Sequence, residues 1–125
     1  MRAEAVIRSY RDLRVWSAAM DLVTSTYKVS KKYPKDELYG LTSQSRRAAV
    51  SVPSNIAEGH GRKHVGEYLH HLSIANGSLM ELETQVRIAF RLEYLNTDEQ
   101  DALLRRAADV GRMLAGLITS LRKRR

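Results

Sequence analysis

The sequence predicts an all-α protein, an antiparallel up-down four-helix bundle, from three observations. Apolar residues recur at helical three–four spacing in four segments, and the alternation typical of strands is nowhere sustained. The connections between these segments are short, which places successive helices antiparallel. Only two prolines interrupt the chain. Because 125 residues suffice for one core, we expect a single four-helix-bundle domain over residues 1–125, with an N-terminal arm at 1–11 and a basic tail at 122–125.

The first predicted helix spans about residues 12–32. Its main apolar stripe consists of Leu13, Trp16, Met20, Val23 and Tyr27. Ser9 and Asp12 both suit the N-cap position, because their side chains can accept a hydrogen bond from the first turn. Pro34 ends the helix, since the residue before a proline disfavours the α conformation.

The second predicted helix spans about residues 39–58 and contains a proline. Its apolar side consists of Leu41, Ala48, Val52 and Ile56. Pro53 removes one backbone donor and should kink the helix, but Ile56 resumes the pattern beyond it. Gly59 and Gly61 then end the helix.

The third helix is predicted for about residues 64–94, and the fourth begins at a capping box formed by Thr97 and Gln100. The stripe of the third helix consists of Leu72, Ala75, Leu79, Leu82, Val86 and Ala89. The stripe of the fourth consists of Leu103, Ala107, Val110, Leu114, Leu117 and Leu121.

The first and fourth helices each carry a second apolar stripe, more than one core face requires. An unused apolar face favours self-association, although a single wide core face would produce the same pattern. The candidate oligomer contacts are Val15, Ala19, Leu22, Leu104, Ala108, Gly111, Ala115 and Ile118.

The composition favours a polyanionic partner. Lys plus Arg number 21 and Asp plus Glu number 14, for a formal charge of +7. Such an excess attracts nucleic acid and, less often, an anionic membrane surface. The absence of cysteine excludes disulfides, thiolate metal sites and cysteine nucleophiles. No signal peptide or membrane span is evident, so we expect a cytoplasmic protein.

Clustered cations are the candidate nucleic-acid contacts: Arg62, Lys63, Arg105, Arg106, Arg122, Lys123, Arg124 and Arg125. Phosphate contacts would supply most of the affinity for RNA or DNA and make binding sensitive to salt. Few aromatic residues are available for base stacking. The alternative is an oligomeric scaffold that uses the same charge to meet an acidic protein partner, without nucleic acid.

No pattern indicates an enzyme, a cofactor or a metal site. Glu67 and His70 have the spacing of di-metal bundle ligands, but a second such motif is missing. No serine lies in a glycine elbow, as a hydrolase nucleophile would. The run from Gly59 to Lys63 before a helix could hold an anion, but it also suits a flexible basic connection. We expect Arg47 to form a structural ion pair with Glu83.

Three segments resemble the "four helix bundle protein" family, encoded by intervening sequences of bacterial large-subunit (23S) rRNA genes and sometimes labelled S23 ribosomal proteins. The segments are Leu13–Trp16, Tyr39–Gly59 and Ile74–Glu83, within a likeness that extends from about Tyr10 to Leu121. The resemblance implies an antiparallel four-helix bundle that assembles as a ring-like homopentamer. The chain also looks similar to the basic pentameric accessory protein of diversity-generating retroelements, which contacts a reverse transcriptase and nucleic acid. The resemblance to the family supplies no catalytic activity, and most members of the family have no assigned function.

Overall fold

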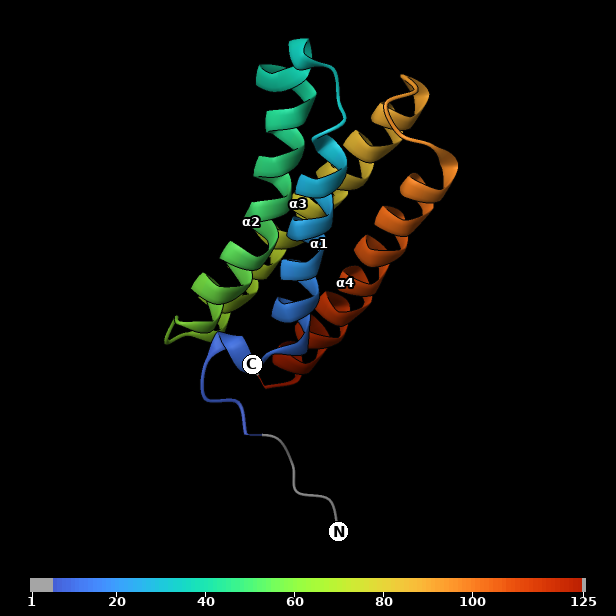
Figure 1. The fold of residues 1–125 in the computed structure, drawn as a ribbon. Helices are drawn as coiled ribbons and strands as arrows, with labels where there is room; N and C mark the ends of the chain where they lie inside the picture. Colours follow the sequence, from blue (N-terminus) through green and yellow to red (C-terminus); the bar gives the residue numbers. More distant parts are fainter. Residues whose placement is uncertain (1–5, 125) are drawn as a thin grey trace.

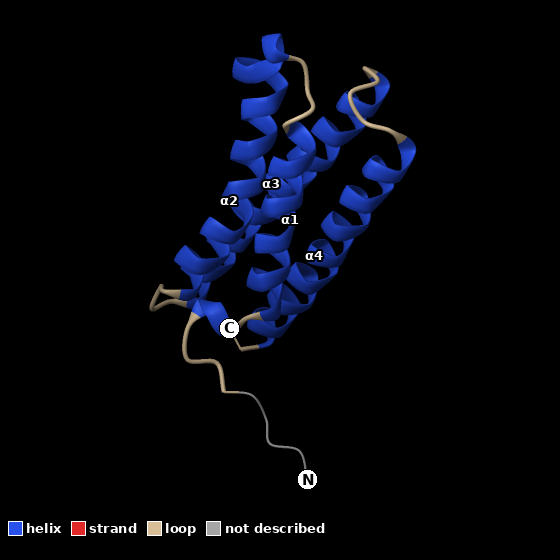
Figure 2. Ribbon diagram, viewed as in Figure 1, coloured by secondary structure: helices blue, strands red, loops and turns tan. Residues whose placement is uncertain are grey.

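The computed structural model describes residues 6–124, which form four α-helices and contain no strand (Figures 1 and 2). The helices are α1 (Arg14–Ser30), α2 (Ser43–His60), α3 (Val65–Arg91) and α4 (Thr97–Lys123). Three short helical turns flank them: η1 (Tyr10–Asp12), η2 (Lys35–Glu37) and η3 (Leu38–Thr42). The predicted all-α class is therefore confirmed for the described residues.

Successive helices run in opposite directions and pack around one apolar core (Figure 1). Each of the pairs α1–α2, α2–α3, α3–α4 and α1–α4 is in contact. The largest fully buried side chains are aliphatic and come from all four helices, among them Leu22, Ile56, Leu79 and Leu114. Up-down order places η1, the α2–α3 connection and the C-terminus of α4 at one end of the molecule (Figure 1).

The core face of α1 differs from the predicted one. The inward residues are Val15, Ala19, Leu22, Thr26 and Ser30, whereas Met20 and Tyr27 are exposed. The hydroxyls of Thr26 and Ser30 bond to backbone carbonyls one turn earlier, which lets these polar residues face the core. The prediction that Val15, Ala19 and Leu22 form oligomer contacts is therefore wrong, because they pack inside the chain's own bundle.

Helix α2 continues through Pro53 as the sequence predicted. Past Pro53 it lies so close to α3 that a Cβ added at Gly59 would stand 2.8 Å from the Cβ of His71. Only a residue without a side chain fits there without displacing its neighbours.

The caps differ from the predicted ones. Asn96, not Thr97, caps α4, and its capping-box partner is Glu99 rather than Gln100. Ser9 forms a capping box with Asp12, but this box begins η1, and no side chain caps α1. Within residues 6–124, no helix combines the length and the apolar character needed to cross a membrane.

Candidate nucleic-acid interface and the polar seam beside it

Exposed cations come together at one end of the bundle from five parts of the chain: the arm, η1, the start of α1, the α2–α3 connection and the end of α4 (Figure 1). We call this the basic end. Its described cations, all exposed, are Arg8, Arg11, Arg14, Arg62, Lys63, Arg122, Lys123 and Arg124. The described residues of the arm and η1 and the adjoining turns of α2 and α3 contribute three carboxylates to this end: Asp12, Glu58 and Glu67. Five of the eight cations were predicted, and Arg125, predicted with them, lies outside the described residues.

The carboxylates of the basic end are already engaged. Asp12 accepts hydrogen bonds from the backbone amides of Arg8 and Ser9, at 2.8 and 3.2 Å, and these bonds lower the pKa of its carboxyl. Glu58 and Glu67 lie on either side of Arg62, with carboxylate oxygens 3.8 and 3.9 Å from its guanidinium nitrogens. Among the described residues, the other cations of the basic end have no ion-pair partner.

At the opposite end of the bundle, here called the paired end, Glu37, Lys32 and Glu99 are held in local contacts. Glu37 accepts hydrogen bonds from the amide of Leu41 at 3.1 Å and the hydroxyl of Tyr94 at 2.8 Å, and both bonds lower the pKa of its carboxyl. Lys32 forms an ion pair with Glu99, which also belongs to the α4 capping box with Asn96.

The predicted contacts Arg105 and Arg106 do not join the other candidates. They belong to the first half of α4, which starts at the paired end (Figure 1). Arg106 lines a shallow groove with the carboxylates of Asp98 and Glu99, and Arg105 lies beside Asp101 in another. Their surroundings therefore contain acidic groups, unlike the α4 tail.

Three cations of the basic end, Arg8, Arg11 and Arg14, were missed by the sequence reasoning. They lie in the arm, in η1 and at the start of α1, separated by apolar and polar residues, so no charge cluster marks them. The predicted up-down order contained the needed signal, because it places the start of the first helix beside the end of the fourth.

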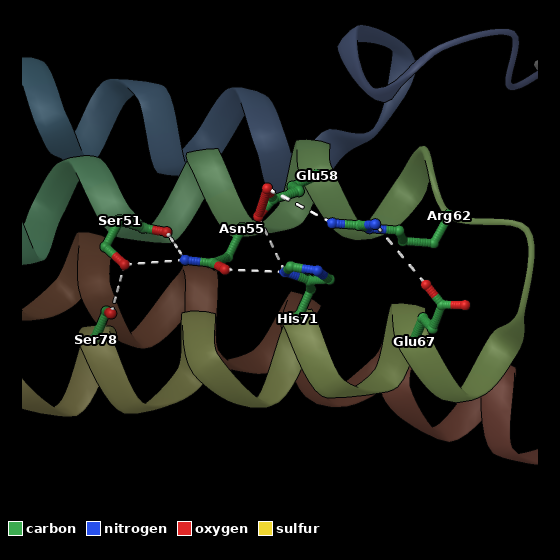
Figure 3. Close-up of polar contacts among 7 residues, drawn as sticks. All are labelled: Ser51, Asn55, Glu58, Arg62, Glu67, His71 and Ser78. Atoms are coloured by element: carbon green, nitrogen blue, oxygen red, sulfur yellow. Dashed lines mark hydrogen bonds and ion pairs between the residues drawn. The ribbon is translucent and has the colours of Figure 1, made fainter.

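A row of half-buried polar side chains, here called the polar seam, joins α2 to α3 and leads toward the basic end (Figure 3). Ser78 donates to the hydroxyl of Ser51 at 2.8 Å. The Asn55 amide nitrogen donates to the Ser51 carbonyl at 2.9 Å and to its hydroxyl at 3.0 Å. The oxygen of Asn55 is therefore left to face Nδ1 of His71, at 3.2 Å.

His71 links the polar seam to the basic end (Figure 3). Its Nδ1 also lies 3.3 Å from a carboxylate oxygen of Glu58, and Glu58 contacts Arg62. Two acceptor oxygens, from Asn55 and Glu58, therefore face the same ring nitrogen. This arrangement assigns the hydrogen of neutral His71 to Nδ1 and leaves Nε2 as the site for a second proton.

The predicted ion pair between Arg47 and Glu83 is not formed. Arg47 is exposed and lines a polar groove that also contains Glu81. The half-buried arginine is instead Arg46, whose Nε donates to Ser30 at 2.9 Å. Its guanidinium also lies 4.7 Å from the ring centre of Tyr27. Arg46 thus binds α2 to α1 without a carboxylate.

Two apolar surfaces stay uncovered on the outside of the bundle. One is the second stripe of α4, where Leu104, Ala108, Gly111 and Ile118 are partly exposed and Ala115 is exposed. The other, here called the α1–α2 groove, has a volume of about 300 Å³ and is lined by Tyr10, Trp16, Met20, Val23, Val50, Pro53, Ser54 and Ala57. The three α1 residues of this groove were predicted to face the core.

The residues with metal-ligand spacing do not form a ligand cluster. Glu67 contacts Arg62, and His70 lies on the exposed side of α3. Within the described part of the chain, no three His, Cys, Asp or Glu side chains lie close enough together to hold a metal ion.

Comparison with known proteins gives one family. The family described as "23S rRNA-intervening sequence protein" matches residues 11–116, which include all four helices except the last turns of α4. Among curated proteins, no sequence matches the chain. The matched range includes the polar seam and four of the eight described cations of the basic end: Arg11, Arg14, Arg62 and Lys63. Because it covers most of the sequence, the chain belongs to the 23S rRNA-intervening sequence protein family.

Proposed function

We propose that the protein is a non-enzymatic nucleic-acid-binding protein that contacts the phosphates of RNA or DNA with its basic end. One observation carries the proposal: cations from the arm, η1, α1, the α2–α3 connection and the α4 tail converge at one end, where carboxylates are few. A rigid bundle that presents these charges together requires no further folding in order to bind a polyanion.

Phosphate contacts dominate this mode of binding. Each phosphate that a lysine or arginine neutralises releases counterions, so affinity falls steeply as salt rises. The first amides of α3 add donors at the same end, because its N-cap residue His64 makes no side-chain cap. Tyr10, the aromatic residue of η1, packs edge-on against Trp16, with 5.2 Å between the two ring centres. Its ring is therefore not free to stack on bases. We therefore expect weak sequence preference.

The proposal is tested by two matched double variants. Lys123→Ala with Arg124→Ala removes two cations from the basic end, whereas Arg105→Ala with Arg106→Ala removes two from the first half of α4. Binding to a single-stranded RNA and to a DNA duplex is measured at several salt concentrations. We expect the first variant to lower the log–log salt slope by about two units and the second to leave it nearly unchanged.

Equal effects of the two double variants would show that the whole basic surface, not one end, attracts the polyanion. A wild-type protein that binds neither probe at any salt concentration would overturn the proposal. The scaffold with an acidic protein partner would then become the better explanation of the charge.

We also propose that the protein assembles as a homo-oligomer, a ring-like pentamer as its resemblance to the family implies. The α4 stripe and the α1–α2 groove are different surfaces, and contact between two different surfaces of identical chains forms a ring when the rotation between neighbours closes. Ala115→Glu places a charge in the stripe, and Ser120→Glu places one on another side of α4. Light scattering should show dissociation only for Ala115→Glu. A monomeric wild-type protein would overturn this proposal.

A further inference from the structure

We propose that His71 is a positioning residue that controls Arg62 through Glu58, so that protonation of His71 releases Arg62 for a nucleic-acid phosphate. The inference rests on the proposed function. The three residues form a continuous chain of contacts from the polar seam to the basic end (Figure 3).

Glu58 is shared between two bases. One of its oxygens lies 3.3 Å from Nδ1 of His71, and the other lies 3.8 Å from a guanidinium nitrogen of Arg62. The His71 side chain is only 14% exposed, whereas that of Arg62 is 44% exposed. Arg62 is therefore open to an incoming phosphate, and the carboxylate of Glu58 competes for the same group.

The polar seam fixes the direction of the His71 ring. Asn55 is oriented by its two bonds to Ser51, and its oxygen faces Nδ1 of His71. On the backbone side, Gly59 allows α2 to pass so close to His71 that even a methyl group would collide there. Because Asn55 faces Nδ1 and the Cβ of His71 packs against Gly59, the side chain is held with Nδ1 directed at Glu58.

Protonation changes how Glu58 divides its charge. Neutral His71 donates a hydrogen bond from Nδ1 without carrying charge. A second proton on Nε2 makes the ring a cation, and its contact with Glu58 becomes an ion pair. The carboxylate is then compensated by His71, so Arg62 loses part of its intramolecular partner and presents more positive potential to solvent. Histidine side chains in general change charge between pH 5 and 8, and the experiments below compare the two sides of this range.

Other titratable groups lie near this chain of contacts and must be separated from it. On α3 these are Glu67 and His70, whose ring centre is 5.9 Å from that of His71. On α2, His60 lies against Tyr68 at 5.9 Å. Asp12 of η1 interacts with His60, and Arg124 of α4 interacts with Tyr68. Of the carboxylates named here, only Glu58 contacts both His71 and Arg62.

The first experiment compares His71→Gln with His70→Gln. Binding of a fluorescent single-stranded RNA is measured at pH 8 and pH 5.5 at constant salt. We expect the affinity of the wild type for RNA to be about two- to fivefold higher at pH 5.5 than at pH 8, after subtraction of any change seen in His71→Gln. This factor corresponds to the free energy of a surface ion pair. His70→Gln should keep the full rise. An equal loss in both variants, or no loss in His71→Gln, would overturn the proposal.

The second experiment compares Glu58→Gln with Glu67→Gln. Each removes one carboxylate from Arg62, so both should bind RNA more tightly than the wild type at pH 8. Only Glu58→Gln should also abolish the His71-dependent rise, because Glu67 has no contact with His71. This pair keeps the test decisive even if circular dichroism shows that His71→Gln does not fold. Persistence of the rise in Glu58→Gln would contradict the proposal.

A measurement without nucleic acid separates this inference from the proposed function. In the free protein, the NMR signal of the Arg62 Nε–H group should move between pH 8 and pH 5.5, and Glu58→Gln should suppress that movement. If the wild type binds no RNA or DNA at either pH, the proposed function fails, and a moving Arg62 signal still supports the coupling. A stationary Arg62 signal in a protein that binds RNA overturns the coupling alone.

Discussion

The two ends of this bundle treat charge in opposite ways. At the paired end, Glu37 bonds to a backbone amide and to Tyr94, and Glu99 serves both a capping box and an ion pair with Lys32. At the basic end, the described cations outnumber the carboxylates, and Arg62 alone among them has ion-pair partners. The same helices therefore end in a surface of mixed charge on one side and a predominantly basic surface on the other.

This contrast separates charge that serves folding from charge that is available to a partner. Carboxylates at the paired end satisfy backbone groups that would otherwise lack partners at helix starts. Cations at the basic end satisfy no such group, and their mutual repulsion opposes folding. This excess of positive charge at one end is what the proposed contact with nucleic-acid phosphates would use.

The charged residues of the basic end can be held together only if the helices beneath them are tightly packed. Gly59→Ala tests this support, because the new Cβ would lie 2.8 Å from His71 and 3.0 Å from the Tyr68 ring. We expect a loss of roughly 1–3 kcal/mol in unfolding free energy, typical of overpacking, in chemical denaturation.

The matched control for Gly59→Ala is Gly77→Ala in α3, where an added Cβ meets nothing within 4 Å. Alanine should stabilise the helix there by about 0.5–1 kcal/mol. If both substitutions stabilised the protein, the close approach of α2 and α3 beside His71 would not exist in solution.

A second test concerns Tyr33 at the paired end. Its ring centre lies 5.6 Å from that of Tyr94. Burial raises the pKa of Tyr33 from 10.0 to about 12. The folded state therefore keeps the proton more tightly than the unfolded state. The resulting stability is present below pH 10 and is lost as pH rises from about 10 to about 12.

Tyr33→Phe should reduce this alkaline loss of stability, measured as the fall of the melting temperature between pH 9 and pH 11. Some loss will remain, because the pKa values of Tyr68 and Tyr94 are also raised, by burial and by the bond to Glu37 respectively. Tyr39→Phe is the control, since Tyr39 is 92% exposed. An equal effect of the two substitutions would show that Tyr33 is not buried.

Helix starts provide a third test of the comparison. Asn96 caps α4 at the paired end through a bond to the Glu99 amide at 2.8 Å, so Asn96→Ala should cost about 1 kcal/mol. His64 begins α3 at the basic end without a side-chain cap, so His64→Ala should change stability by at most about 0.5 kcal/mol. Thermal denaturation that gave equal losses would show that the two ends are built alike.

The sequence predicted the number and order of the helices but did not identify the most deeply buried face of α1. Its strongest apolar stripe, which includes Trp16 and Met20, lies toward the outer groove. The true core face ends in Thr26 and Ser30, whose hydroxyls are satisfied by the helix's own backbone. Hydrophobicity alone cannot rank two adjacent stripes when local hydrogen bonds make a polar residue compatible with burial.

The candidate site was predicted only in part, for a related reason. The tail and the pair Arg62–Lys63 are runs of charge, so the sequence marks them, but the role of Arg46 and Arg47 depends on which way each side chain turns around α2. That direction brings Arg46 over Tyr27 and turns Arg47 toward solvent. The polar seam could not be found from spacing, because its members come from two helices in register.

The smallest expected effect on stability comes from the tail. Leu121 is the last buried residue of α4, at 1% exposure, and the described tail residues after it are exposed. A chain truncated after Leu121 should therefore keep its unfolding free energy within roughly 0.5 kcal/mol. The same truncation removes at least three cations from the basic end, so its log–log salt slope for nucleic acid should fall by about one unit for each phosphate that is no longer neutralised. Binding should weaken for all sequences alike, since phosphates carry no sequence information. A truncated protein with unchanged stability and an unchanged salt slope would make the tail a solvated helix end, and the contrast between the two ends would then depend on the arm and the α2–α3 connection alone.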